Sequence, residues 1–171
     1  IKEEIWQIWQ ILLIAKECHS YSFYLHRPDT KEESDYLQHS RDFNFIRHML
    51  WRMTVIELSK LFRNSPQNDR FNLFHFISKL KKGGHFGKLG ISENKIEEWE
   101  SKMTDNTQTI SEMLLLRDKL YSHTAPNKKK YIDGNLTFEK IEELIKIVES
   151  VIREIYSSVF DSHASIGTIS F

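Results

Sequence analysis

Residues 136–160 read LTFEKIEELIKIVESVIREIYSSVF, and this stretch carries the clearest structural signal in the chain. Thr137 stands where a helix N-cap is expected, and Leu136 and Ile141 occupy the two positions of a hydrophobic staple. The pattern predicts an amphipathic helix that buries one face. That face consists of apolar residues at helical spacing: Ile141, Leu144, Ile145, Val148, Ile152 and Ile155.

Few residues interrupt the helical pattern in the rest of the chain. The sequence has only 6 Gly and 3 Pro among 171 residues. Because glycine and proline are the main breakers of regular structure, long helices are predicted between them. The turn signals gather in residues 27–29, 65–68, 83–90, 125–126 and 133–135.

The segments between these turns carry their own helix signals. Thr30 and Glu33 match a capping box that opens the second segment, which we expect to break near Ser40. Residues 71–80 predict a short, aromatic-rich helix. Residues 92–122 keep one apolar register, which fits one long helix or two helices broken near Thr104–Thr107, and a kink is favoured over a full break.

These segments predict an all-α fold, an antiparallel bundle of about five helices. No stretch alternates with period 2, and no internal repeat of 20 to 50 residues occurs. At 171 residues and 40% hydrophobic content, the chain is expected to form a single globular domain over residues 1–171. The tail, residues 162–171, is poorly specified.

Composition narrows the classes of function. The 24 basic and 24 acidic side chains give a net charge of zero, which argues against non-specific coating of nucleic acid. The longest apolar run, Ile11–Ala15, is too short for a membrane span, so we expect a soluble protein. The single Cys18 fits a reducing cytoplasm, and no recognised metal-ligand spacing is present.

The sequence RDKLYSH, residues 117–123, holds the candidate chemistry. Helical spacing places Arg117 on the apolar stripe of its helix, where an unpaired charge is costly, so we expect it to line a cleft or an anion site. His123 lies six residues on and faces away from Arg117 on an ideal helix. We expect the helix to fray before Pro126 and to let the imidazole swing back.

The same residues resemble the Arg-x(4–6)-His signature of the HEPN superfamily, with Asp118 at its polar position. Residues 51–80 resemble the abortive-infection branch of that superfamily. The resemblance implies a helical, usually homodimeric fold in which two motifs share a cleft. It also implies a metal-independent, cofactor-free endoribonuclease that leaves a cyclic phosphate, acting as a toxin or phage-defence effector, with an antitoxin protein as a further partner.

The resemblance gives roles to the motif residues. His123 would transfer protons, Arg117 would hold the phosphate, and Asp118 would anchor backbone or orient a neighbour from another face of the helix. RNA contacts are predicted for four further residues, Tyr121, Lys128, Lys129 and Lys130.

Several alternatives stay open at the level of sequence. Arg41 with His48 and Arg70 with His75 also match the spacing, although neither pair straddles a helix end. Arg117 could instead form a structural salt bridge with Glu57 or Glu143, and Tyr121 could be a core residue. A catalytically inactive RNA- or nucleotide-binding module paired with an antitoxin, or an inert helical scaffold, would then replace the enzyme.

Overall fold

The computed structural model describes residues 1–64, 71–121 and 135–167. Within these ranges it holds seven α-helices and no strand, which confirms the all-α class. The bounds are α1 Lys2–His26, α2 Lys31–His39, α3 Arg41–Phe62, α4 Leu73–Leu80, α5 Glu93–Asp105, α6 Thr107–Leu116 and α8 Phe138–Phe160. A 3₁₀ turn, η1, spans Gly87–Leu89, and a π-helical turn, η2, spans Arg117–Tyr121.

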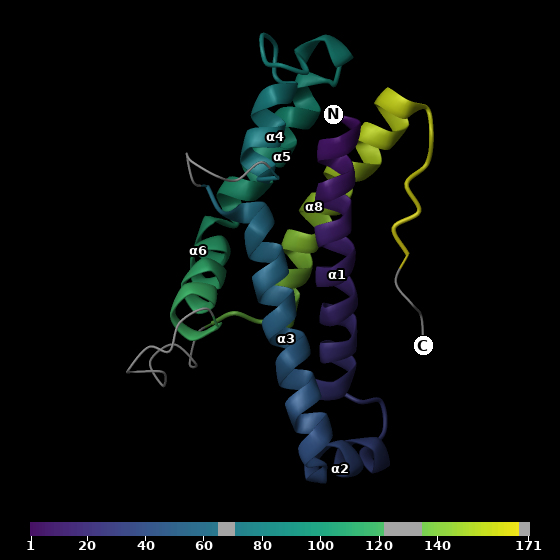
Figure 1. Cartoon of the computed structure of the whole chain (residues 1–171), viewed down its shortest axis with the longest axis vertical. Helices are drawn as coiled ribbons and strands as arrows, with labels where there is room; N and C mark the ends of the chain where they lie inside the picture. Colours follow the sequence, from purple (N-terminus) through teal and green to yellow (C-terminus); the bar gives the residue numbers. More distant parts are fainter. Residues whose placement is uncertain (65–70, 122–134, 168–171) are drawn as a thin grey trace.

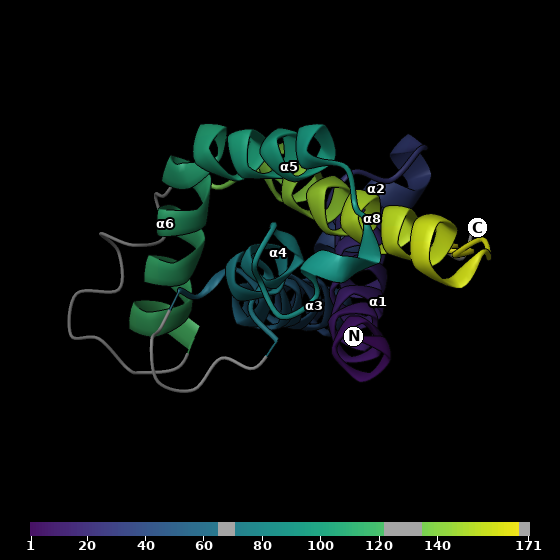
Figure 2. The ribbon, with the colours of Figure 1, turned by 90° about the horizontal axis from the view of Figure 1, so that it is seen from above.

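Three long helices form the body of the bundle (Figure 1). α1 runs in the opposite direction to both α3 and α8, and it packs against each of them. α2 closes one end of the α1–α3 pair, whereas α4 and α5 lie at the other end. α6 flanks the outer side of α3, so the turn that follows α6 lies against α3 (Figure 2).

The helix caps follow the sequence closely. Thr30 and Glu33 form both hydrogen bonds of a capping box at the start of α2. Ser40 ends α2 in an extended conformation, and its hydroxyl accepts the Phe43 N–H at 3.4 Å to begin α3. Thr137 accepts the Lys140 N–H at 3.4 Å at the start of α8. Polar side chains thus satisfy N–H groups that have no partner inside their own helices.

The core confirms the apolar stripe predicted for α8. All six residues of that stripe are at most 4% exposed, and the large side chains of Trp99 in α5 and Phe62 in α3 are each 1% exposed. The stripe packs against α1 through Ile5, Ile8, Leu12 and Ala15. Burying such aliphatic side chains contributes roughly 1.5–3 kcal/mol each, so this face is the main attachment of α8.

The expected number of about five helices is too low because two segments divide. One break is the predicted one near Ser40. The other falls at Asn106, inside residues 104–107, where a kink was favoured over a full break; that preference is wrong, because α5 and α6 are separate helices that run in different directions (Figure 2). The Asn106 side chain donates to the Lys102 carbonyl at 2.9 Å, and the Thr107 hydroxyl donates to the Thr104 carbonyl at 2.6 Å. Such side-chain bonds to backbone compete with helix continuation and end α5 here.

The C-terminal segment is better specified than its sequence predicts, as far as Gly167. Ala164 and Ile166 are 5% and 4% exposed, so their side chains join the core. Arg153 donates to the Ala164 carbonyl at 3.0 Å, and Lys16 donates to the Ile166 carbonyl at 3.2 Å. These contacts hold residues 164–166 along the bundle.

Candidate functional site

Arg117 begins η2, the π-helical turn that continues from the end of α6. Its Nε lies 3.1 Å from Oδ1 of Asp118, and the two side chains are 18% and 48% exposed. The Asp118 carboxylate thus reaches the guanidinium of its neighbour in sequence, in keeping with the role of orienting a nearby residue that the sequence predicts for it. Asp118 therefore orients the Arg117 guanidinium while solvent still reaches it.

The glutamates considered as structural partners of Arg117 bind elsewhere. Glu57 accepts a hydrogen bond from Lys60 at 2.6 Å, and Oε1 of Glu143 lies 3.4 Å from Nζ of Lys146. In the part of the chain that the structure describes, Asp118 is the sole carboxylate within ion-pair distance of Arg117. The guanidinium is thus not neutralised by a carboxylate of another helix.

Tyr121 ends the π-turn and anchors it to α3. Its side chain is 7% exposed, which fits the interpretation as a core residue. Arg52 of α3 donates from Nη2 to the Tyr121 carbonyl at 2.6 Å, and its Cζ lies 5.8 Å from the centroid of the tyrosine ring. Burial raises the pKa of Tyr121 to about 12, against the charge of Arg52 and a hydrogen bond with Trp51. The phenol therefore stays neutral at physiological pH.

His48 is a second residue of α3 beside this turn. Its exposed imidazole meets Tyr121 edge-on, with ring centroids 6.3 Å apart. Sequence reasoning considered His48 only as a rival motif partner of Arg41 and did not connect it with Arg117. The spacing of His48 and Arg52, four residues apart on one helix face, is the signal that could have found this pair.

The remaining predicted site residues fall beyond the described part of the chain. His123 follows Tyr121 by two residues, and it lies outside the described residues, as do Lys128, Lys129 and Lys130. The structure thus brings together Arg117, Asp118 and Tyr121 from the motif, and it adds two residues of α3.

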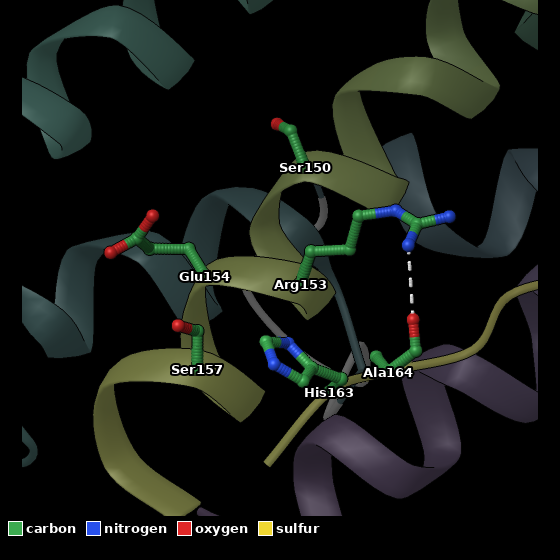
Figure 3. A pocket seen from close by; sticks show the side chains of 6 residues that line it. All are labelled: Ser150, Arg153, Glu154, Ser157, His163 and Ala164. Carbon is green, nitrogen blue, oxygen red and sulfur yellow. Dashed lines mark hydrogen bonds between the residues drawn. The ribbon is translucent and has the colours of Figure 1, made fainter. Parts of the chain in front are cut away.

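A pocket of about 370 Å³ lies away from the motif, along the C-terminal half of α8 (Figure 3). Its lining includes both a guanidinium and a carboxylate, and Figure 3 shows them turned in opposite directions, with Arg153 toward the Ala164 carbonyl and Glu154 away from it. Its full lining is Ser150, Arg153, Glu154, Ser157, His163 and Ala164. Among the described residues, no cluster of three or more His, Cys, Asp or Glu side chains could hold a metal ion. Nor does any helix of the described ranges combine the length and apolarity needed to cross a membrane.

An all-helical bundle with an acidic residue directly after the motif arginine agrees with what the HEPN resemblance implies. The sequence model of one HEPN family, AbiU2, matches residues 1–169. The chain therefore belongs to the AbiU2 family, an abortive-infection-like family of the HEPN superfamily. This confirms the resemblance that was drawn from residues 51–80 and 117–123. No curated protein and no solved structure matches the chain.

Proposed function

We propose that the chain is a metal-independent endoribonuclease of HEPN type, a toxin or phage-defence effector that acts as a homodimer. The observation that carries the proposal is the state of Arg117. Its side chain is 18% exposed, and Asp118 of the same turn, not a carboxylate of another helix, is its ion-pair partner. An arginine held in this way keeps N–H donors for an incoming anion, and guanidinium can bind two phosphate oxygens at once.

The chemistry follows from the residue types of the motif. The 2′-hydroxyl of one ribose loses its proton and attacks the adjacent phosphorus, and the bond from phosphorus to the 5′-oxygen breaks. The leaving oxygen takes a proton, so the products are a 2′,3′-cyclic phosphate and a 5′-hydroxyl. His123 can perform either proton step near neutral pH, and two copies in a dimer would divide the two steps. Arg117 stabilises the negative charge on the phosphate.

The neighbouring residues take supporting roles in this proposal. Asp118 holds the guanidinium in place and is a positioning residue. Tyr121 is assigned to the wall of the site rather than to base stacking, because its ring is buried. Lys128, Lys129 and Lys130 follow the motif in sequence and would guide RNA toward it. An antitoxin protein that covers the motif is the further partner proposed.

The test is cleavage of a mixed RNA substrate in the presence of EDTA. Fragments that end in a cyclic phosphate are expected, and Arg117→Ala and His123→Ala should each lower the rate by at least about 100-fold. Arg63→Ala and His163→Ala remove exposed side chains of the same types and serve as matched controls. Cleavage by the motif variants at the wild-type rate would end the assignment. RNA that is bound by the wild type but never cut would favour the inactive binding module.

A further inference from the structure

One face of α3 presents cationic, aromatic and imidazole side chains to solvent. Arg41, Phe45 and His48 are all exposed, and the Phe45 side chain keeps 64% of its surface accessible. At 3.6 residues per turn, these three residues and Arg52 fall within about 60° of one another around the helix axis. We call Arg41, Phe45 and His48 the α3 stripe.

The α3 stripe leads directly to the candidate site. His48 meets the ring of Tyr121, and Arg52, one turn further along, binds the Tyr121 carbonyl. From Arg52 back to Arg41 the helix rises roughly 16 Å, at 1.5 Å per residue over eleven residues. A polymer bound at Arg117 would thus find a continuous track along this face of α3.

The charges of the stripe favour an anionic occupant. Between Arg41 and Arg52 the one carboxylate is Asp42, which lies about a quarter of a turn away from Arg41. No ion pair among the described residues involves Arg41 or His48. Phe45 lies between them and offers a flat, exposed aromatic ring beside these two side chains.

We propose that the α3 stripe binds a single-stranded segment of the RNA substrate next to the cleavage site. Phe45 stacks on a base, Arg41 contacts a backbone phosphate, and His48 lies nearest the cleavage site. Aromatic stacking beside positive charge is the usual means of holding single-stranded nucleic acid. Paired RNA hides the faces of its bases, so the exposed ring selects an unpaired stretch. This inference rests on the proposed function, since it takes RNA as the substrate.

Binding is measured apart from cleavage with a fluorescein-labelled 12-nucleotide oligouridylate that carries 2′-O-methyl groups, because such RNA has no 2′-hydroxyl to attack. Fluorescence anisotropy with the full chain should show that Phe45→Ala weakens binding about tenfold. Arg41→Gln should lower the slope of log affinity against log salt concentration by about 0.7, the value for one phosphate contact on a single strand. Tyr36→Ala is the matched control, because Tyr36 is 68% exposed, lies on α2 and faces Phe43 rather than the stripe.

Each outcome decides between the two proposals. The proposal that the α3 stripe binds RNA is overturned if the wild type does not bind the probe, or if both stripe variants bind it as tightly as the wild type. The nuclease proposal is unaffected by either result as long as the wild type still cuts unmodified RNA. Weaker binding in the stripe variants, with no cleavage by the wild type, supports the stripe and ends the nuclease. The stripe could instead bind a second copy of the chain, and sedimentation velocity tests this. If the wild type is a dimer and Phe45→Ala is a monomer, the stripe is a subunit interface and its assignment to RNA is overturned.

Discussion

Arg52 connects α3 to the turn that begins with Arg117, and Arg52→Met isolates that connection. Methionine keeps much of the apolar stem but removes the guanidinium that donates to the Tyr121 carbonyl at 2.6 Å. A hydrogen bond from a charged group contributes about 1.5–3 kcal/mol, and a cation over a ring at 5.8 Å adds about 0.5–1 kcal/mol. Arg52 is only partly buried, and in the variant water can replace it at the Tyr121 carbonyl. We therefore expect the free energy that holds residues 117–121 closed to fall by about 2 kcal/mol.

The loss should be local before it is global. Hydrogen exchange followed by mass spectrometry should show amides of residues 117–121 exchanging about 30-fold faster, which is 2 kcal/mol at about 1.4 kcal/mol per factor of ten. Amides in the middle of α8 should keep their protection. Arg52→Lys should recover part of the protection because its ammonium still donates, although without the planar fork.

The control is Arg63→Met, since Arg63 is exposed at the end of the same helix. It should change neither the exchange pattern nor the urea midpoint. If Arg52→Met changes the exchange rates of residues 117–121 by less than about twofold, or lowers the protection of α8 by as much as that of residues 117–121, the hydrogen bond to Tyr121 does not hold the turn locally, and the reasoning is refuted.

Two further predictions concern acid sensitivity and the site itself. Burial holds the pKa of His19 below its ordinary value, against the pull of the Phe138 carbonyl that accepts from Nε2 at 3.0 Å. As the pH falls, the unfolded chain therefore takes up the His19 proton before the folded chain does. The contribution of His19 to the free energy of unfolding is complete above about pH 6.5 and falls as the pH drops below that value. His19→Gln should make the urea midpoint less dependent on pH between pH 7 and 5, and an unchanged dependence of the midpoint on pH would refute this. Asp118→Ala should change the free energy of unfolding by less than about 1 kcal/mol, as for exposed ion pairs. It should lower the rate of RNA cleavage about tenfold, because the Arg117 guanidinium loses the group that orients it. A fall in the free energy of unfolding of more than about 2 kcal/mol would instead make Asp118 a structural residue.

Sequence patterns predicted the elements whose stability is local or periodic. The capping box at Thr30 and the cap at Thr137 depend on residues three apart, and the α8 stripe depends on a period that the helix itself imposes. The number of helices was less accessible. The apolar register continues from α5 into α6, so periodicity alone could not decide between a kink near residues 104–107 and the full break that Asn106 and Thr107 make there.

The candidate site departs from the prediction for a related reason. The sequence predicts a helix that continues through residue 122 and frays only before Pro126. In the structure the α-helix ends at Leu116 and a π-turn follows through Tyr121, so the regular α-helical phase ends earlier than predicted. Tertiary contacts hold this turn in place: the ring of Tyr121 is buried, and the Arg52 guanidinium donates to the Tyr121 carbonyl. Arg52 lies 69 residues before Tyr121 in the sequence. The early end of the α-helix is therefore tied to the contact between α3 and η2, which no spacing within the motif encodes.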